Sequence, residues 1–482
     1  MNILGISAGF HDAAATVINR GEIVYAAHAE RYSKIKNDAN LHEAMFWEFS
    51  RGRHIDHIAY YETPWKKQLR QLYSGQGIEW SKLTTSRVLK QQLGGYFSEV
   101  PVTTHNHHLS HAAAGFQTSP FDRATVVVID AIGEWDTISI WGAEYVNGRA
   151  TYKKLWRQLY PKSIGLFYSA ITGRLGLRPM EDEYITMGMS AYGRPLYTDT
   201  MRILAEENMH IGTDFMFLPL ASDADIASSA QAVVEELIYN VMRRAKDFGW
   251  STNLCYMGGV ALNCLANKNL GEYFEKIWIM PNPGDAGSSL GAAALAYGGP
   301  VEFKNAFLGT DISGPYPVNA VLDSLLRDKI TGVASGRAEF GPRALGNRSL
   351  LADPRVPDIK DRVNAIKRRQ EFRPFAPVIL EEQVDNYFHM PGGFVDSRYM
   401  QVIGTCRHPD LYPAIVHHDG TSRIQTVPKD GSGIRELLEK WYVVTGCPML
   451  LNTSLNIRGE PMVNDRQDAD RFEQQYNVKV HS

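Results

Sequence analysis

Two segments of the chain repeat one order of strands and turns, and this repeat constrains the fold more than any other feature. In the first segment a strand, a Gly-rich turn and two further strands are expected over Asn2–Ser7, Ala8–Asp12, Ala13–Ile18 and Glu22–Ala27. In the second segment a strand, a turn with a carboxylate and two further strands are expected over Ala124–Ile129, Asp130–Gly133, Thr137–Trp141 and Ala150–Trp156. The repeat predicts a duplicated α/β lobe, although two unrelated hairpins would give the same local pattern.

The length of the chain favours more than one domain. It has 482 residues, whereas single hydrophobic cores stop growing near roughly 250–300 residues. Residues 301–317 are rich in Gly, Pro and Asn and show no periodicity. We therefore predict one domain over residues 1–310 and a second over residues 320–482.

Composition argues against several classes of protein. The net charge of -3 gives no bulk attraction to polyanions such as nucleic acid. The four cysteines include no C-x-x-C pair and fit a reducing cytoplasm better than a disulfide framework. No stretch approaches the roughly 20 apolar residues that a membrane helix needs, and the start has no basic, apolar leader. We expect a soluble, cytoplasmic protein with no membrane partner.

His107 and His111 are spaced so that their side chains share one face of a helix. Two imidazoles at this spacing suit one metal ion, and a carboxylate would complete a site of the iron, manganese or zinc type. Asp130 follows a buried strand and Asp285 lies at the expected start of a helix, so both are candidate ligands. The alternatives are a polar helix start for the histidines and a plain N-cap for Asp285.

Two further motifs have residues suited to binding a phosphate group. Gly258-Gly259 follows the expected strand Asn253–Met257 and opens a helix, where backbone N–H groups favour an anion; such turns are also often only structural. The C-terminal part contains SGRAEFGPRALGNRS from Ser335 and KRRQEFRPF from Lys367. Arginines held among Gly and Pro predict bidentate binding of a small phosphate ligand, with a nucleic-acid patch as the alternative.

Motifs along nearly the whole chain resemble those of the NodU/CmcH/TobZ-type O-carbamoyltransferases, in the same order. They include GISAGFHDAAATV, HHLSHAAAGF, VIDAIGEWD, MGGVALN, PGDAGSSLGAA, GRAEFGPRALGNRSLLADPR, FRPFAPV, HDGTSRIQTV and LLNTSLNIRGEP. The resemblance implies an α/β fold with a duplicated actin-like, Kae1-like domain followed by an α+β YrdC-like domain. It also implies a reaction in two steps. Carbamoyl phosphate and ATP give carbamoyl-adenylate in the second domain, and the first domain transfers the carbamoyl group to an acceptor hydroxyl.

The resemblance also implies roles for individual residues. The metal site, usually iron in the family, corresponds to His107, His111, Asp130 and Asp285. The sites for ATP (with Mg) and for the donor carbamoyl phosphate correspond to Arg337, Arg343, Arg348, Lys367, Arg373, Arg423 and Ser454. The carbamoyl-adenylate site corresponds to Lys36, Glu183, Gly258, Gly259 and Asn263. The candidate catalytic residues are Lys36 together with His11 and Asp12, which would orient or deprotonate the acceptor hydroxyl.

The acceptor is left open by the motifs. A hydroxyl of a sugar-type small molecule and a hydroxymethylated pyrimidine, in a nucleotide or in DNA, are chemically equivalent candidates. Ile185 stands where the family has a Lys near the acceptor, which puts the family's acceptor contacts in doubt here. The alternative functions are a tRNA threonylcarbamoyl transferase-like enzyme and a non-catalytic, actin-like nucleotide-binding module. The oligomeric state is also open, a homodimer included.

Overall fold

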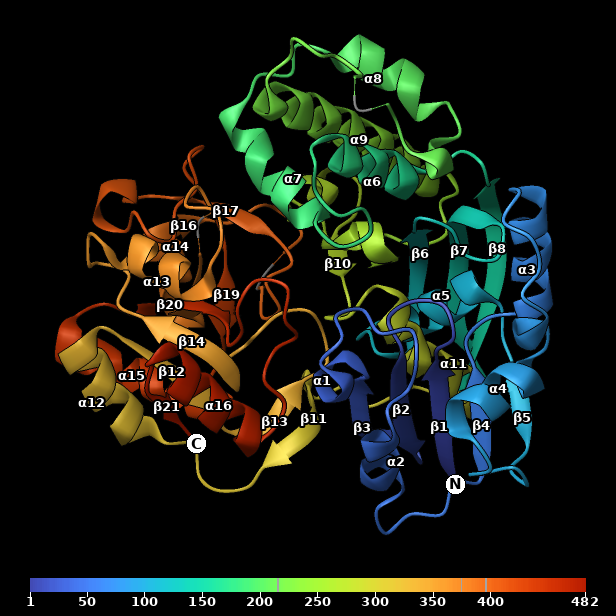
Figure 1. Ribbon diagram of the computed structural model, residues 1–482, viewed down its shortest axis with the longest axis horizontal. Coiled ribbons are helices and arrows are strands. Elements are labelled where there is room, and N and C mark those ends of the chain that lie inside the picture. The colour runs from blue at the N-terminus through green and yellow to red at the C-terminus, as the bar shows by residue number, and fades with distance from the viewer. Residues whose placement is uncertain (215, 374, 395–396) are drawn as a thin grey trace. The chain divides into compact units, whose positions relative to one another are not determined.

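The computed structural model describes residues 1–214, 216–373, 375–394 and 397–482. The chain divides into two compact units, which Figure 1 shows by residue colour. Unit 1 contains Met1–Ser33, Asn37–Ala266 and Leu270–Lys304, and unit 2 contains Lys34–Lys36, Asn267–Asn269 and Asn305–Ser482. The strand β11 (Phe307–Ile312), largely within the predicted first domain, pairs with a strand of unit 2.

Unit 1 contains two five-stranded sheets of the same topology. The first has the order β3-β2-β1-β4-β5, formed by Glu22–His28, Ala14–Asn19, Asn2–Ser7, His57–Tyr60 and Val102–Thr104. The second has the order β8-β7-β6-β9-β10, formed by Arg149–Leu159, Asp136–Val146, Arg123–Ile129, Asn253–Met257 and Lys276–Trp278. In each sheet three antiparallel strands are followed by two that run parallel to the first. The predicted duplication is confirmed, because unrelated hairpins would not share the two added parallel strands.

Two helices, α5 (His107–Gln117) and α11 (Ser288–Tyr297), pack against each other and against the sheets. α5 contacts β6 and β9 of the second sheet, whereas α11 contacts β1, β2 and β4 of the first. Glycine permits this close approach: a Cβ added at Gly291 would lie 1.7 Å from the carbonyl oxygen of Ser110, and one at Gly5 would lie 1.9 Å from that of Ser289. The small-residue helices therefore hold the two lobes together.

Other helices cover the outside of unit 1. α6 (Ile164–Arg174), α7 (Glu183–Met189) and α8 (Thr198–Ala205) pack on the long helix α9 (Asp223–Asp247). Beside the first sheet lie α1 (Glu30–Ser33), α2 (Glu43–Ser50) and α4 (Thr85–Leu93), whereas α3 (Pro64–Tyr73) lies beside β8 of the second sheet. The short α10 (Cys264–Asn267) follows β9.

Unit 2 is built on a mixed six-stranded sheet with helices on both faces. Its order is β19-β15-β20-β14-β12-β21, formed by Gln425–Val427, Ala376–Leu380, Met449–Ser454, Arg348–Ala352, Ile330–Ala334 and Val480–His481. Two smaller sheets contain β11 with β13 (Gly336–Glu339), and β16 (Phe388–His389), β17 (Ile403–Cys406) and β18 (Thr421–Arg423). The helices are α12 (Val318–Asp328), α13 (Ile359–Lys367), α14 (Val384–Tyr387), α15 (Gly433–Thr445) and α16 (Arg466–Tyr476).

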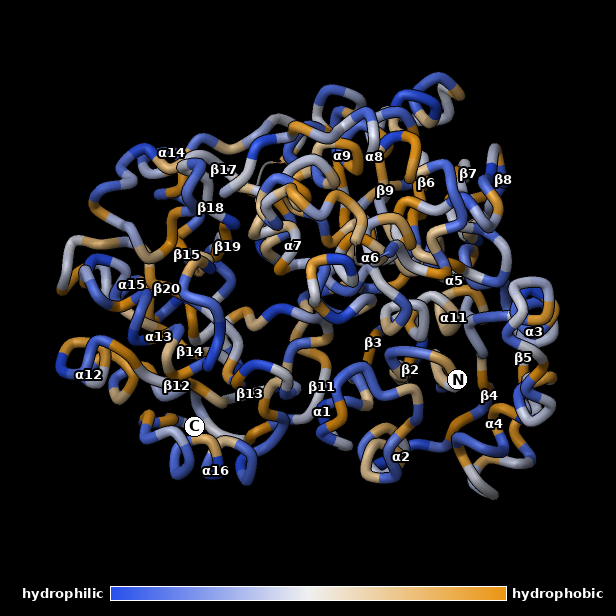
Figure 2. The backbone as a smooth tube through the Cα atoms, turned by 45° about the horizontal axis from the view of Figure 1, so that its top comes forward, coloured by the Kyte–Doolittle hydropathy of each residue, from blue (hydrophilic) through white to orange (hydrophobic). Residues whose placement is uncertain are grey.

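The central strands of this sheet are apolar on both faces, as Figure 2 shows by their colour. Leu351 and Leu450 face one core with Trp441 of α15, while the neighbouring Leu350 and Leu451 face another. This alternation follows from the period of two in a strand, and it explains why residues 449–451 (MLL) and 350–352 (LLA) are continuous apolar runs in the sequence. The predicted α/β class is confirmed.

Candidate metal and phosphate sites

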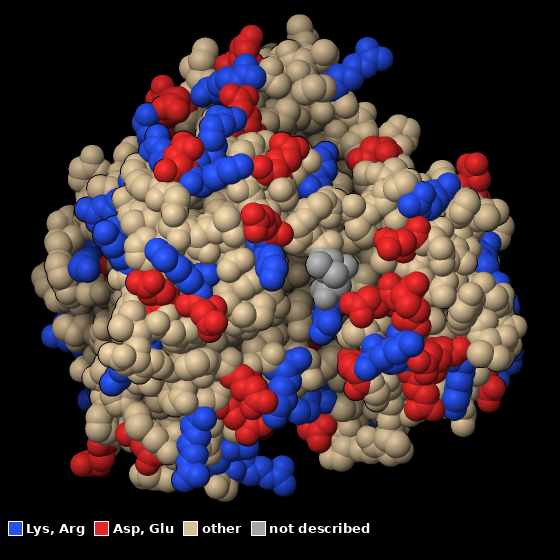
Figure 3. All heavy atoms as spheres, turned by 180° about the vertical axis from the view of Figure 1, so that it is seen from behind, with Lys and Arg blue, Asp and Glu red and all other residues tan. Residues whose placement is uncertain are grey.

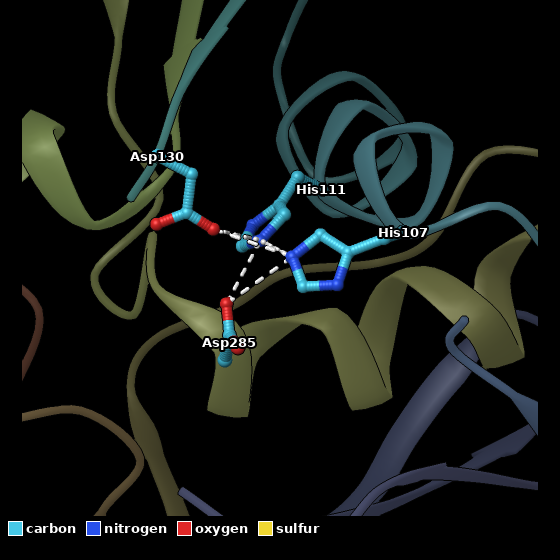
Figure 4. Close-up of side chains that lie close together, drawn as sticks. All are labelled: His107, His111, Asp130 and Asp285. Carbon is cyan, nitrogen blue, oxygen red and sulfur yellow. Dashed lines mark hydrogen bonds and ion pairs between the residues drawn. The ribbon is translucent and has the colours of Figure 1, made fainter. Parts of the chain in front are cut away.

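Four side chains in unit 1 converge on one point, and all four are those predicted as metal ligands. His107 and His111 lie one turn apart on α5, Asp130 directly follows β6, and Asp285 begins the short 3-10 turn before α11. His107 Nε2 lies 3.2 Å from Asp130 Oδ2 and 3.3 Å from Asp285 Oδ1. His111 Nε2 lies 3.4 Å and 3.3 Å from the same oxygens. Figure 4 shows the four side chains pointing toward one another.

This geometry fits a transition metal. One ligand atom from each residue lies within 4.8 Å of the others, and the two Nε2 atoms are only 3.2 Å apart. Ligands about 2.1 Å from a common ion would be separated by about 3.0–3.4 Å along the edges of an octahedron or tetrahedron. His111 Nδ1 lies 3.0 Å from the carbonyl oxygen of Pro283, to which it can donate, so that Nε2 is free to coordinate. Two imidazoles and two carboxylates suit iron, manganese or zinc.

The charges of these four side chains strongly shift one another's pKa values. Burial opposes the charged form of His107, but Asp285, Asp130 and Glu62 outweigh burial and raise its pKa well above the usual value. Burial likewise disfavours the Asp130 carboxylate, yet hydrogen bonds from His107 and His111 lower its pKa well below the usual value. Protons therefore compete with a metal for the imidazoles, and metal affinity should fall as the pH is lowered.

Local sequence explains why the two histidines point inward. The side chain of Asn106 accepts a hydrogen bond from the N–H of Leu109 at 3.1 Å, which caps α5 and starts the helix at His107. His108 lies on another face, with Nδ1 2.8 Å from Ser139 Oγ, and does not belong to the cluster. The helical period thus selects two of three nearby histidines.

Glu62 supports the cluster and was not predicted from the sequence. It is fully buried just beyond β4, and its Oε2 lies 3.1 Å from His107 Nδ1. Lys67 Nζ donates to Glu62 Oε1 at 3.2 Å. Burial raises the pKa of Glu62, but Lys67 and His107 reverse this effect and lower it. The sequence offered one indication of this role, an acidic residue just after a strand. Many unrelated proteins have such a residue, so this feature alone does not predict a functional site.

Two other turns of unit 1 with predicted site residues lie near this cluster: the turn with His11 and Asp12, and the turn with Gly258 and Gly259. His11 Nδ1 is 3.2 Å from Asp12 Oδ2. Burial lowers the pKa of His11, but Asp12 first, and then Asp285 and Asp130, raise it to about 9. The N–H of Gly259 lies 3.4 Å from Asp130 Oδ1, so this turn borders the cluster as well.

Gly258 is required by the backbone at this turn. Its φ is +91°, and an added Cβ would lie 2.1 Å from the carbonyl oxygen of Ile129. No residue with a side chain fits such a position without displacing the end of β6, which carries Asp130.

Two of the residues predicted to bind the adenylate, Asn263 and Glu183, form hydrogen bonds within unit 1. Asn263 exchanges hydrogen bonds with Gln231, at 3.0 and 3.1 Å. Glu183 accepts a hydrogen bond from the N–H of Met180 at 2.6 Å at the start of α7. Ile185 on the same helix is fully buried, so its side chain belongs to the core.

Unit 2 contains a basic cluster around Lys367. Its buried ammonium group donates to Ser454 Oγ at 3.2 Å and to Asn456 Oδ1 at 3.0 Å. Burial, then Arg369, Arg373 and Lys36, lower the pKa of Lys367 well below the usual value. Lys36 therefore belongs with the predicted phosphate-binding residues, although it is far from them in sequence.

The predicted arginines of unit 2 fall into two groups. Arg348 is fully buried, and its guanidinium donates at 2.9–3.1 Å to the carbonyl oxygens of Thr310, Ser335, Gly336, Asn347 and Asn464. Arg337 likewise donates to the carbonyl oxygens of Gly309 and Leu308 in β11. Arg343 and Arg423 are half-buried, and Arg423 Nε has no hydrogen-bond partner among the described residues. The structure thus distinguishes Arg348 and Arg337, which bind backbone carbonyls, from Arg423, whose Nε is left to bind a ligand.

Both units match models of one protein family. The carbamoyltransferase N-terminus model matches residues 52–211 and 216–294, and the carbamoyltransferase C-terminus model matches residues 322–481. The chain belongs to the carbamoyltransferase family. The resemblance drawn from the motifs is confirmed, and the family indicates a transferase.

Relatives of this carbamoyltransferase align over most of its length. An uncharacterized protein of Synechocystis sp. is 33% identical over 98% of this chain and 94% of the relative. Nodulation protein NolNO of Sinorhizobium fredii is 30% identical over 95% of this chain and 76% of the relative. Nodulation protein U of the same species is 29% identical over 73% of this chain and 72% of the relative.

The surface of the carbamoyltransferase carries both positive and negative charges. Figure 3 shows basic and acidic side chains interspersed over one face. Within the described part of the chain, no helix has both the length and the apolarity needed to span a membrane.

Proposed function

We propose that this carbamoyltransferase couples ATP and carbamoyl phosphate to the carbamoylation of an acceptor hydroxyl. For the atoms to balance, carbamoyl phosphate, water and ATP give carbamoyl-adenylate, orthophosphate and pyrophosphate. The acceptor oxygen then attacks the carbamoyl carbon, the bond to the adenylate oxygen breaks, and AMP leaves with a carbamate ester as the second product. The observation that carries this proposal is that the two family models cover both units, each with a polar cluster suited to one step.

We assign the activation step to unit 2, whose fold we expect to be YrdC-like. Arg343, Lys367, Arg373, Arg423 and Lys36 would bind the phosphates of the two substrates, and Ser454 would add a hydroxyl. Cationic groups fixed in advance stabilise the charge that develops on leaving pyrophosphate. Lys367 donates to oxygens of Ser454 and Asn456, backbone carbonyls included, so it would act on the phosphates through its charge, beside Arg373 and Lys36. Arg348 and Arg337 are not included, because they bind backbone carbonyls and are not among the cations that act most on Lys367.

We assign the transfer step to unit 1. His107, His111, Asp130 and Asp285 would hold one metal ion, which when bound supplies Lewis-acid stabilisation of the adenylate phosphate. The Gly258-Gly259 turn borders Asp130 and would offer backbone N–H groups to the same phosphate.

His11 and Asp12 would act on the acceptor. With a pKa of about 9, His11 carries a proton at neutral pH and would donate a hydrogen bond to an oxygen. The carboxylate of Asp12 is then the candidate to accept the proton of the acceptor hydroxyl. The acceptor is a sugar-type hydroxyl or a hydroxymethylated pyrimidine. A mass-spectrometric screen for the carbamoyl mass increment would distinguish them.

Two variants test the division of labour. His111→Ala should leave pyrophosphate formation largely intact and abolish transfer, because it removes a ligand in unit 1 only. Arg373→Ala should abolish pyrophosphate formation yet still transfer from chemically made carbamoyl-adenylate. His108→Gln is the matched control and should keep both activities, since His108 faces Ser139. If both His111→Ala and Arg373→Ala remain folded but lose both activities, the two steps do not occur at separable sites.

A further inference from the structure

The helix α3 exposes apolar side chains and buries polar ones. Its four exposed residues are Trp65, Leu69, Leu72 and Tyr73, at 50%, 47%, 52% and 69% exposure. Their spacing of four, three and one residues places them along one face of the helix. Helices on the surface of globular proteins usually show the opposite arrangement.

The buried face of α3 is fixed by specific polar contacts. Lys67 pairs with Glu62 at 3.2 Å and lies 3.5 Å from the centre of the Phe10 ring. Gln68 is fully buried and its Oε1 accepts a hydrogen bond from the N–H of Glu79 at 2.7 Å. Arg70 donates to Gln76 Oε1 at 3.3 Å. The helix cannot rotate to cover its apolar face without breaking these contacts.

The exposed apolar area is large for a single helix. With about 150–250 Å² for a whole aromatic side chain, the two aromatic residues and two leucines together expose roughly 350–450 Å². A stable protein interface buries about 800 Å² on each partner, with an apolar centre and a polar rim. The face of α3 therefore supplies about half of that area, as the centre of such an interface. Figure 1 shows α3 along the outer margin of unit 1.

We propose that this face of α3 packs against the same face of a second copy of the chain. A two-fold interface requires a surface that complements itself. None of the exposed residues of α3 is charged, so two copies would meet without like-charge repulsion. Lys66, at the edge of the face, has a side chain that is 39% exposed, with its ammonium 5.8 Å from the centre of the Trp65 ring. Glu134, 3.5 Å away, offsets its charge. A membrane-binding helix would present several Lys and Arg beside its apolar face, whereas α3 has Lys66 alone there, paired with Glu134, because Lys67 and Arg70 are buried.

Molar mass in solution tests this proposal. Light scattering after size-exclusion chromatography should give twice the mass of the chain for the wild type. The Leu69→Asp/Leu72→Asp variant should give the mass of a single chain. Ile203→Asp is the matched control, because Ile203 is 70% exposed on another helix of unit 1 and should leave the dimer intact. All three positions are exposed, so thermal unfolding should show that the variants remain folded.

A cross-link provides an independent measurement. The four native cysteines are buried, so Leu69→Cys would add one reactive thiol. Oxidation should give a covalent dimer if two copies of α3 meet near this position. A monomeric wild type, or a dimer unchanged by the Leu69→Asp/Leu72→Asp substitutions, would overturn the proposal. Binding of the wild type to anionic lipid vesicles, lost in the same variant, would also overturn it in favour of a membrane surface.

Discussion

Replacing Glu62 by Gln should weaken metal binding although Glu62 is not a proposed ligand. Its carboxylate has two oxygens, and both are used: Oε2 lies 3.1 Å from His107 Nδ1, and Oε1 lies 3.2 Å from Lys67 Nζ. Lys67 Nζ also lies 3.4 Å from Oε2. In a glutamine a single oxygen would have to accept from both His107 and Lys67, and the amide NH2 would face one of these two donors. The buried Lys67 would compete for that oxygen, and His107 would no longer be held with Nε2 toward the cluster.

The size of the effect follows from the contact that is lost. Removing a group that orients a metal-bound histidine typically weakens affinity by about 10–100-fold, which corresponds to about 1.4–2.7 kcal/mol. Competition with a chromogenic chelator at fixed pH would measure the dissociation constant directly. Thermal unfolding of the variants would show that the fold is retained.

His108→Gln is the control for this experiment. It changes a buried imidazole on the same helix whose Nδ1 faces Ser139. We expect its metal affinity to equal that of the wild type. If Glu62→Gln also binds metal as tightly as the wild type, Glu62 does not orient His107, and the proposed role of this carboxylate fails.

Three further changes have expected outcomes. Arg348→Ala should lower the free energy of unfolding, measured in urea, by about 3–5 kcal/mol, because several buried carbonyls lose their donor. Hydrogen bonds from Arg435 first, against burial, lower the pKa of Glu382 to about 2. The pair therefore stabilises the fold above the pKa of an unfolded glutamate and loses this effect as the pH falls toward 2. Because Glu382 is 40% exposed, Glu382→Gln should cost less than about 1 kcal/mol at pH 7, and this cost should disappear as the pH falls below 2 in the same assay. Gly258→Ala should abolish transfer but retain pyrophosphate release, because the added Cβ would displace the turn beside Asp130.

Much of unit 1 could be predicted because its information is local. The order of strands and turns in the two lobes follows from periods and Gly-rich turns in the sequence, and the sheets have that order. The proposed ligands were also accessible, because the spacing of His107 and His111 is a property of one helix. Asp130 and Asp285 lie in turns at the ends of elements, and glycines close to them, Gly133 and Gly284, mark these turns in the sequence.

The roles of residues whose partners are far away in the sequence could not be predicted from local patterns. Arg343 and Arg348 lie in one run, yet Arg348, which begins the central strand β14, is fully buried, whereas Arg343 is half-buried. No local pattern distinguishes the two guanidinium groups. Lys36 lies more than three hundred residues from Lys367 along the chain, but its charge acts on that lysine within unit 2. Such pairings depend on the tertiary structure.

The duplication also explains why the proposed metal site lies where it does. α5 follows β5, the last strand of the first sheet, and α11 follows β10, the last strand of the second, so the two helices occupy equivalent positions. The histidines come from the first turns of α5, and Asp285 comes from the turn that precedes α11. Asp130 comes from the turn after β6, while the equivalent turn after β1 carries His11 and Asp12. The two lobes thus offer equivalent backbone positions with different side chains, one turn suited to a metal and the other to proton transfer. A duplicated fold can provide two different sites in this way, because the residues of a turn can be substituted while the strands on either side of it keep their arrangement.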